Sequence, residues 1–299
     1  MNPAVSIGMP VYDGENYLRQ AVDSILGQTF GDFELIISDN ASTDATHDIC
    51  EDYSRRDARI RVYRNETNLG AAANYNRTVA LATAPLFKWA AHDDVLAPTF
   101  LERCIGVLEQ DREVVLCHTQ SRFIDESGMP QEDYGVHLRT DSVVPHIRFH
   151  DLIWVRHWCL QVFGVMRRDA LDHTDLHGDY ASADRVLLVQ MAFQGRFHEV
   201  PQRLFFSRRH SQQASRLVYD LHKYDRWFGP RRGASWPATR LVLEHLSAVR
   251  QAELSSAERA RCYWSGMLRL TRFLKIWSRD LTVPIRTALG HQNSTRSLP

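Results

Sequence analysis

The residues that decide the fold are 5–46, VSIGMPVYDGENYLRQAVDSILGQTFGDFELIISDNASTDAT. Apolar runs at residues 5–9 and 33–38 have the length of β-strands, and the second is continuous enough to be buried on both faces. Between them, apolar residues recur at helical spacing after Asp13, a suitable N-cap. A strand, a helix and a second strand in this order predict a parallel sheet covered by helices.

The same alternation continues along the first two-thirds of the chain. Further strands are expected at residues 60–63, 86–90, 114–118, 162–166 and 204–207. Helices are expected after residues 42–44, from 70 to 82, from Pro98 and over 186–193, whereas the turn-rich residues 125–160 predict loops over a site. We therefore predict an α/β fold with a Rossmann-like, mostly parallel sheet flanked by helices over residues 1–215. A C-terminal helical extension over residues 216–299 is expected to follow.

Composition narrows the class of protein. An apolar content of 44% and a charged content of 24% are those of an ordinary globular chain. Acidic and basic residues balance at 36 each, which argues against a nucleic-acid partner. The charge is uneven, because residues 231–299 carry 12 Lys and Arg against 4 Asp and Glu. The five cysteines form no CxxC pair, which predicts reduced thiols and neither zinc nor disulfides.

The amino-terminal residues have no basic segment followed by an apolar run, and no stretch approaches the roughly 20 apolar residues that span a bilayer. We therefore expect a cytoplasmic protein. Between Arg259 and Arg279, apolar and basic residues share one amphipathic stretch. This stretch predicts either a peripheral helix on the anionic inner face of the membrane or a helix packed onto the catalytic domain with its basic face in water.

Polar clusters follow three of the expected strands, at residues 10–13, 39–40 and 92–94. In an open α/β sheet, ligands bind beyond the carboxyl ends of the strands. A carboxylate can accept a hydrogen bond from a nucleobase, a tyrosine can stack on it, and two adjacent carboxylates favour a hard cation. Each cluster alone also fits a plain turn or a solvated loop. The motifs G-x-G-x-x-G and G-x-x-x-x-G-K-[ST] are absent, so neither nicotinamide binding nor P-loop chemistry is supported.

The run quoted above resembles the start of the family 2 glycosyltransferases, which have the nucleotide-sugar-binding GT-A fold. NLGAAANYN at residues 68–76 and FKWAAHDDVLAPTFLE at 87–102 are similar to the family's second block, which ends in its metal-binding DXD motif. YASADRVLLVQMAFQGRFHEVPQRLFF at residues 180–206 extends the resemblance to about residue 210. Each piece is degenerate, but their order and spacing together are specific.

The resemblance implies which residues bind the donor nucleotide. Pro10, Tyr12 and Asp39 would hold the nucleobase, and Asn68 and Asn74 match positions near the nucleotide, although Asn74 also fits a plain helix residue. Glu15 would brace the base-binding loop from the first turn of the first helix, or would be a surface acid of that turn.

The resemblance also implies a metal site, with one departure from the family pattern. Asp93 matches the last acid of the DXD motif and would coordinate Mg²⁺ or Mn²⁺. The first acid is replaced by Ala91, so its contact to the ribose is lost, and Asp94 is the candidate to compensate as a metal ligand. We assign the intervening His92 to the donor nucleotide.

The cluster Arg208-Arg209-His210 follows the expected strand 204–207 and is placed to stabilise a diphosphate leaving group. Arg209 is assigned to the donor. His210 resembles a position that meets metal or phosphate in related enzymes. A basic cluster on the surface is the alternative interpretation.

Inverting transfer needs a carboxylate that takes the proton of the acceptor hydroxyl. Asp184, at the start of the expected buried helix, matches the family's acidic pair, with helix capping as its alternative role and Asp179 as the nearby competitor. Trp154, His157 and Trp158 lie in the turn-rich region and are candidates either for an acceptor platform or for buried aromatics.

The resemblance therefore predicts an inverting, metal-assisted glycosyltransferase with a nucleotide-diphosphate sugar as donor and a glycan or lipid-linked acceptor, as in cell-envelope polysaccharide synthesis. One alternative is a nucleotidyltransferase, which would typically have a Gly/Arg/Lys-rich loop after the first strand. Another is a catalytically degenerate nucleotide-sugar-binding protein, which Ala91 suggests. The prediction requires Asp39, Asp93 and Asp184 to surround one cleft.

Overall fold

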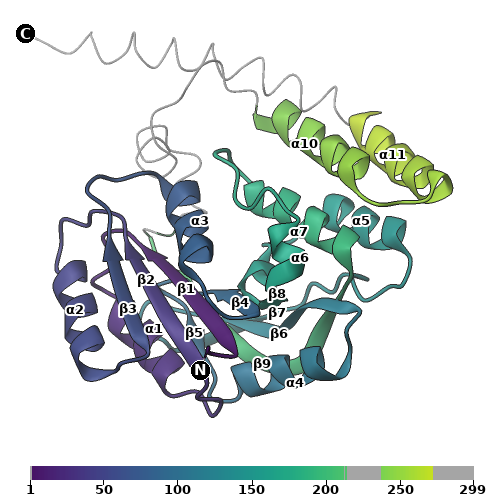
Figure 1. Cartoon of the computed structure of the whole chain (residues 1–299). Helices are drawn as coiled ribbons and strands as arrows, with labels where there is room; N and C mark the ends of the chain where they lie inside the picture. Colours follow the sequence, from purple (N-terminus) through teal and green to yellow (C-terminus); the bar gives the residue numbers. More distant parts are fainter. Residues whose placement is uncertain (1, 212, 214–236, 272–299) are drawn as a thin grey trace, which may run out of the picture.

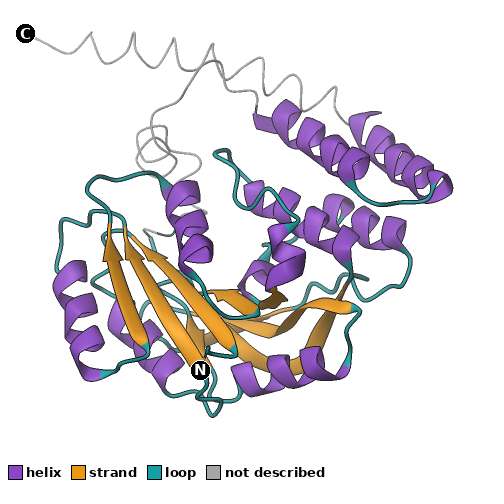
Figure 2. Cartoon of the chain, viewed as in Figure 1, coloured by secondary structure: helices purple, strands orange, loops and turns teal. Residues whose placement is uncertain are grey.

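A computed structural model describes residues 2–211, 213 and 237–271, and its centre is one curled sheet (Figures 1 and 2). The strand order is β3-β2-β1-β4-β8-β6-β9-β5, and β7 pairs with β6 outside this path. The strands are β1 (Val5–Val11), β2 (Phe33–Asp39), β3 (Ile60–Arg64), β4 (Leu86–Trp89), β5 (Val95–Leu96), β6 (Val114–Ile124), β7 (Pro130–Tyr134), β8 (Val165–Arg167) and β9 (Arg196–Arg208).

The first four strands of this order are parallel, because β1 pairs in parallel with β2 and β4, and β2 with β3. β6 and β9 are also parallel, whereas β8 runs antiparallel between β4 and β6. β5 and β7 pair antiparallel with β9 and β6. The predicted α/β fold with a mostly parallel sheet is thus confirmed, with antiparallel strands added in its second half. The register places Val11 opposite Asp39, so the loops after β1 and β2 lie side by side.

Helices cover both faces of the sheet (Figure 2). They are α1 (Leu18–Leu26), α2 (Thr46–Arg56), α3 (Ala71–Leu81), α4 (Phe100–Gln110), α5 (Pro145–Trp154), the 3₁₀ turn η1 (Leu160–Phe163), α6 (Arg168–Asp172), α7 (Ala183–Gln194), α10 (Pro237–Gln251) and α11 (Ser256–Thr271). α1 shows the principle, since its buried residues Leu18, Ala21, Val22 and Ile25 recur at one face. Burial of each of the larger side chains, those of Leu18, Val22 and Ile25, stabilises the fold by roughly 1.5–3 kcal/mol.

Two apolar clusters form the core, one on each face of the sheet. The first joins α1, α2 and α4 to the strands, and the second joins α3, α5, α6 and α7. Gly8 lets α3 approach β1 closely, because a Cβ at this position would overlap Thr78 and would lie 2.8 Å from Phe87. α10 and α11 bury Val249 and Cys262 in the second cluster, so this pair of helices packs onto α5 and α7 (Figure 1).

The start of α1 differs from the prediction. The helix begins at Leu18, and Asp13 has a left-handed φ of 47° instead of capping it. Asp13 Oδ1 accepts the N–H of Thr43, and the N–H of Gly14 donates to Thr46 Oγ1. The polar side chains after β1 are therefore bonded to the neighbouring loop after β2, which local sequence spacing does not reveal.

Other boundaries also differ. Residues 125–160, expected to be loops, contain β7 and α5, and the strand expected at 162–166 is divided between η1 and β8. β6 and β9 extend well beyond 114–118 and 204–207, and α4 begins two residues after Pro98. α3 and α7 lie where helices were expected. Residues 216–236 and 272–299 of the expected helical extension lie outside the described residues.

All five cysteines are free and buried, as expected for reduced thiols. Of the helices that the structure describes, none has both the length and the apolar character needed to cross a bilayer.

Candidate active site

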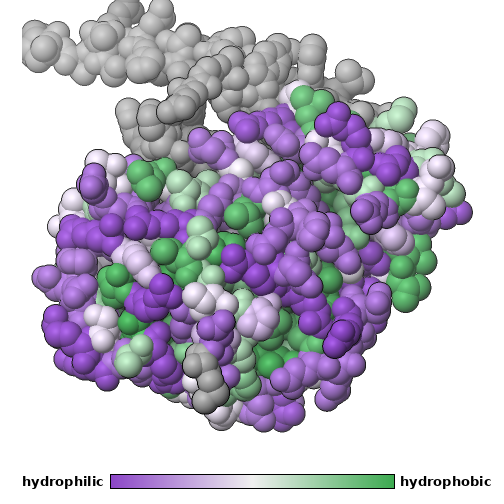
Figure 3. Space-filling view, viewed as in Figure 1, coloured by the Kyte–Doolittle hydropathy of each residue, from purple (hydrophilic) through white to green (hydrophobic). Residues whose placement is uncertain are grey.

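The face of the described chain in Figure 3 is mostly hydrophilic, and its apolar residues are scattered among polar ones. Such scattering is normal and identifies no site on this face. A polar cleft of about 800 Å³ lies beyond the carboxyl ends of β1 and β4. It is enclosed by α3, by residues 156–163 and by the end of β9. This is where a ligand of an α/β sheet is expected.

Most of the predicted site residues line this cleft: Pro10, Tyr12, Asn68, Asn74, His92, Asp93, Asp94, Asp184, Arg209 and His210. Glu15 and Asp39 are not among the lining residues. The cleft therefore joins Asp93 and Asp184, two of the three acids that were expected to meet, while Asp39 lies behind its wall.

Asp93 forms one end of the cleft together with His210. Asp93 Oδ2 lies 2.8 Å from His210 Nε2, and the two side chains are only 13% and 6% exposed. Burial alone would raise the pKa of Asp93, but the hydrogen bond from His210 and the positive charges of His92 and His210 lower it below its ordinary value. Tyr17 supports the imidazole, with ring centroids 4.9 Å apart. Asp93 is thus held as a carboxylate.

Asp94 faces the strand β9. Its Oδ1 accepts the backbone N–H of Arg208 at 2.8 Å, and burial together with the neighbouring charge of Asp93 raises the pKa of its carboxyl. A carboxyl that favours its neutral form is a weak cation ligand. The predicted metal role of Asp94 therefore receives little support from this geometry.

Arg208 does not point into the cleft, which corrects the expectation that it would meet a diphosphate. It is fully buried, and its guanidinium donates to the carbonyl oxygens of Asp93, Asp125 and Glu126 and to Gln20 Oε1. This side chain fastens the loop that carries Asp93 to β9, to the turn after β6 and to α1.

Asp184 forms the opposite end of the cleft, in the first turn of α7. Burial raises its pKa above the ordinary value, while the positive charge of Arg185 and hydrogen bonds from the Cys159 thiol and the Arg185 N–H act in the lowering direction. The guanidinium of Arg185 donates to the carbonyl of His157 at 2.6 Å. The competitor Asp179 is exposed and does not line the cleft.

Tyr75 connects the two ends electrostatically. It lines the cleft, and its pKa is raised first by burial and then by the charges of Asp93, Asp94 and Asp184. The Tyr75 phenol is thus close enough to Asp93, Asp94 and Asp184 for their charges to act on it. Asp93 and Asp184 therefore share one neighbourhood, whereas Asp39, the third acid of the sequence prediction, lies behind the cleft wall.

The loops after β1 and β2 form a third part of the cleft, with Pro10 and Tyr12 in its wall. Asn40 holds Asn68 there, because its Nδ2 donates to Asn68 Oδ1 at 2.8 Å. Asp39 is fully buried: its Oδ1 accepts the N–H of Ser42, whereas Oδ2 has no hydrogen-bond partner within the described residues. That oxygen lies 3.5 Å from both His47 Nδ1 and Arg64 Nε.

Asn74 and Glu15 make structural contacts. Asn74 is buried, and its amide bonds the hydroxyl and carbonyl of Ser38 on β2. Glu15 lies in the loop before α1, not in its first turn, and its Oε2 accepts the N–H of Ala45 at the start of α2. Glu15 therefore braces the loop, as one of its two predicted roles required, but from outside the cleft.

Arg209 and His92 complete the lining. The Arg209 guanidinium lies 3.5 Å from the centroid of the Phe123 ring and pairs with Glu132 at 2.6 Å. A diphosphate at this place would compete with Glu132 for the cation. His92 packs on Gly14, where a Cβ would come within 2.5 Å of the imidazole Cδ2.

The chemistry of the Asp93–His210 pair fits a divalent cation. Two ligands about 2.1 Å from an octahedral ion lie about 3 Å apart in cis positions, close to the separation observed here, so a cation that displaced the shared proton could take both atoms as ligands. The described residues contain no group of three His, Cys, Asp or Glu side chains arranged for a metal. A cation at this pair would therefore take most of its ligands from a bound diphosphate and water, as Mg²⁺ commonly does.

Sequence reasoning missed the positions of Arg208, Tyr17 and Cys159. Arg208 looks like its neighbour Arg209 in the sequence, and only the alternation of side chains along β9 separates the two. Tyr17 and Cys159 have no local signal, because their partners His210 and Asp184 are far away in the sequence.

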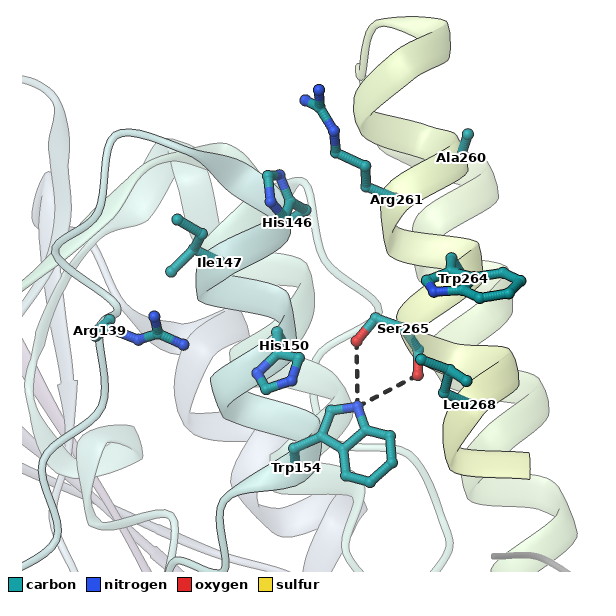
Figure 4. Close-up of a pocket in the computed structure, with 10 residues that line it drawn as sticks. All are labelled: Arg139, His146, Ile147, His150, Trp154, Ala260, Arg261, Trp264, Ser265 and Leu268. Atoms are coloured by element: carbon teal, nitrogen blue, oxygen red, sulfur yellow. Dashed lines mark hydrogen bonds between the residues drawn. The ribbon is translucent and has the colours of Figure 1, made fainter. Parts of the chain in front are cut away.

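A second cavity of about 590 Å³ lies between α5 and α11 (Figure 4). Trp154 faces this cavity, and its indole N–H donates to Ser265 Oγ at 3.1 Å (Figure 4). The candidate acceptor platform is thereby divided: Trp154 packs against α11, His157 is buried, and Trp158 alone of the three is an exposed residue of the cleft.

The helix-flanked sheet is shared by solved structures of other proteins. The fold is similar to that of Staphylococcus aureus TarS, residues 1–349, solved with UDP-GlcNAc, with a TM-score of 0.65 at 16% identity over 91% of this chain and 73% of that one. It is also similar to the mannosyltransferase PcManGT of Pyrobaculum calidifontis, solved with GDP-Man and Mn²⁺. There the TM-score is 0.59 at 16% identity, over 99% and 81% of the two chains.

The sequence model of Glycosyl transferase family 2 matches residues 6–174, more than half of the chain, and the protein therefore belongs to this family. An uncharacterised glycosyltransferase of Methanocaldococcus jannaschii is 34% identical over 42% of this chain and 44% of its own length. One of Rickettsia typhi is 34% identical over 51% and 48%. The chain thus spans less than half the length of these two relatives. The family match includes Asp93 and ends before Asp184 and His210.

Proposed function

We propose that this glycosyltransferase inverts the sugar configuration and moves a sugar from a nucleotide-diphosphate donor to a hydroxyl of a glycan or lipid-linked acceptor, with a divalent cation. One observation carries the proposal: two acids of one cleft are held in opposite electrostatic states, Asp93 as a carboxylate and Asp184 with a raised pKa. The first state suits a cation, and a carboxyl with a raised pKa is the better proton acceptor.

The donor lies along the wall formed by β1 and β2 in this proposal. Tyr12 and Pro10 contact the base, and Asn68 contacts the nucleoside. Asp39 remains the acceptor for a base N–H, and the support is its buried Oδ2, which has ion-pair contacts at 3.5 Å to His47 and Arg64 but no hydrogen bond within the described residues. Such an atom costs free energy unless a partner reaches it.

The diphosphate lies between Asp93, His210 and Arg209. A bound Mg²⁺ or Mn²⁺ would neutralise the charge that develops on the leaving diphosphate. Asp93 and His210 would hold that cation, and Arg209 would add a second positive charge by exchanging Glu132 for a phosphate oxygen.

Asp184 removes the proton from the acceptor hydroxyl. The acceptor oxygen forms a bond to C1 of the sugar, the bond from C1 to the diphosphate oxygen breaks, and the nucleoside diphosphate leaves with the electron pair. Attack from the face opposite the leaving group inverts C1. The proton ends on Asp184, whose raised pKa lets it take a proton and later return it to water.

The test is a thermal-shift screen of UDP-, GDP- and dTDP-sugars with and without Mn²⁺, followed by measurement of donor hydrolysis and of the anomeric configuration of the product. We expect one nucleotide to raise Tm more with Mn²⁺ than without, and a nucleoside diphosphate to be released. Release of pyrophosphate would instead indicate a nucleotidyltransferase. Donor binding without turnover on any acceptor would indicate a binding protein.

A peripheral membrane contact is a second part of the proposal. α11 packs on α5 but presents Trp264 and Met267 to solvent, at 64% and 54% exposure, beside Arg261. Apolar and cationic side chains together favour an anionic lipid surface. Co-sedimentation with phosphatidylglycerol vesicles should fall several-fold in Trp264→Ser/Met267→Ser, and equal binding by this variant would contradict the contact.

A further inference from the structure

Trp158 is exposed at the cleft wall. Its side chain is 53% exposed, and of the large apolar side chains that the described residues expose, it is the one that lines this cleft. Exposed indole area in a cavity is unfavourable unless a ligand covers it, so its position requires an explanation.

The backbone around Trp158 is fixed on both sides. Its N–H donates to Tyr134 Oη at 2.9 Å, and the preceding carbonyl of His157 accepts from Arg185 at 2.6 Å. Cys159, the next residue, has a left-handed φ of 58° and directs its thiol to Asp184. These contacts hold the Trp158 indole at the edge of the cleft. The next residue, Cys159, bonds the proposed general base Asp184.

The surroundings of the indole form a shallow aromatic wall. Phe123 lies edge-on to it, with ring centroids 6.3 Å apart at 70°, and Arg209 lies 6.0 Å from the ring. Phe123 is itself 4% exposed and serves as backing, so Trp158 offers the accessible ring. A flat apolar ring beside cationic and hydroxyl groups suits a ligand with both C–H faces and hydroxyls, as pyranose rings have.

We propose that Trp158 is the acceptor subsite, and that the acceptor presents a pyranose ring there with its reacting hydroxyl at Asp184. The inference rests on the proposed function and adds a substrate class: the acceptor end is a saccharide, not a bare lipid alcohol or a protein side chain. Trp158 acts as a specificity residue that stacks on the acceptor and does not touch the donor nucleotide.

The test uses the full chain with Trp158→Ala and Trp158→Phe. Saturation-transfer NMR with a panel of methyl pyranosides should show binding to the wild-type protein, a loss of about tenfold or more in affinity for Ala, and partial retention for Phe because a smaller ring remains. With a saccharide acceptor, KM should rise by a similar factor while kcat changes little. Leu243→Ala, an exposed large apolar side chain on α10 that lines neither cavity, is the control and should behave as wild type.

Donor hydrolysis without acceptor separates this inference from the proposed function. It should be unchanged in Trp158→Ala. Wild-type donor hydrolysis with pyranoside binding unaffected by Trp158→Ala would overturn the subsite and leave the transferase proposal intact. Failure of every pyranoside to bind the wild-type protein would also overturn it. Absence of donor binding and hydrolysis in the wild-type protein would instead count against the proposed function.

Discussion

The two ends of the cleft contain the same chemical group in opposite environments. At the β4–β9 end, Asp93 faces two histidines, and its pKa is lowered despite burial. At the α7 end, the positive charge of Arg185 and hydrogen bonds from a thiol and a backbone N–H do not offset burial, and the pKa of Asp184 is raised. Environments that shift the pKa values of two carboxyl groups in opposite directions define separate roles for them, as acid–base pairs in other enzymes show. The neighbours, more than the residue type, decide which acid holds charge.

The contrast arises from where the nearby cations point. The imidazole of His210 is directed at Asp93, whereas the guanidinium of Arg185 donates to a backbone carbonyl instead of its neighbour Asp184. Asp184 therefore lacks a strong side-chain hydrogen bond from a cation although one is adjacent in sequence. This arrangement leaves the pKa of Asp184 raised, as the proposed base role requires.

The largest effect is expected at the α7 end. Asp184→Asn should lower transfer by about 10²–10⁴-fold, because a positioned general base contributes that much. Donor binding in the thermal-shift assay should be unchanged. The pKa of Asp184 is raised in the folded protein, so its ionised form destabilises the fold. The uncharged amide of Asp184→Asn should therefore keep or raise Tm at pH 7.

Asp179→Asn is the matched control, because this acid is exposed outside the cleft. It should retain full activity. Normal turnover by Asp184→Asn would remove the proposed difference between the two ends.

A smaller effect, about 10–10²-fold in kcat/KM, is expected for Asp93→Asn, because a neutral amide binds a cation less well. The Mn²⁺-dependent part of the donor-induced Tm shift should disappear with it. His210→Gln sharpens the interpretation, since its amide can still donate to Asp93 but offers only a weaker oxygen ligand to the metal. Unchanged Mn²⁺ response in both variants would show that this end does not hold a cation.

The smallest effect concerns pH. The Cys159 thiol lowers the pKa of Asp184 against the larger effect of burial, so Cys159→Ala should raise that pKa further. A base acts when deprotonated, and the acidic limb of the kcat/KM profile should therefore move to higher pH. Cys159→Ser, a stronger donor, should move it to lower pH. An identical profile in all three proteins would exclude the contact.

The sequence predicts some of these features well and others not at all. β1 and β2 follow from short continuous apolar runs that are buried on both faces, and α7 follows from a longer stretch that is apolar nearly all round. α3 follows from an alanine-rich run after Gly70. The predicted start of α1 was wrong because Asp13 accepts a hydrogen bond from the N–H of Thr43 in the loop after β2. Residues 125–160 gave no clear pattern, since β7 is largely exposed and α5 owes its place to contacts with α7 and α11.

Some residues of the candidate site were likewise predicted from the sequence and others were not. Asp93 and Asp184 were predicted from their resemblance to family motifs, and both line the cleft. The separate fates of Arg208 and Arg209 were not predicted, since one is fully buried and the other stacks on Phe123. Partners in this site are up to 188 positions apart, and local spacing carries no information on such pairs.

Arg208 has a consequence for how the enzyme matures. Its guanidinium bridges Gln20, near the amino terminus, to the carbonyl of Asp93, and its own N–H holds Asp94. Synthesis of the sheet strands up to β8 precedes it, so the loop bearing Asp93 lacks its fastening until residue 208 has left the ribosome and β9 has entered the sheet. The same strand brings Phe197, Val200 and Phe205 into the core, so the surroundings of Asp93 and the core of the sheet are completed together.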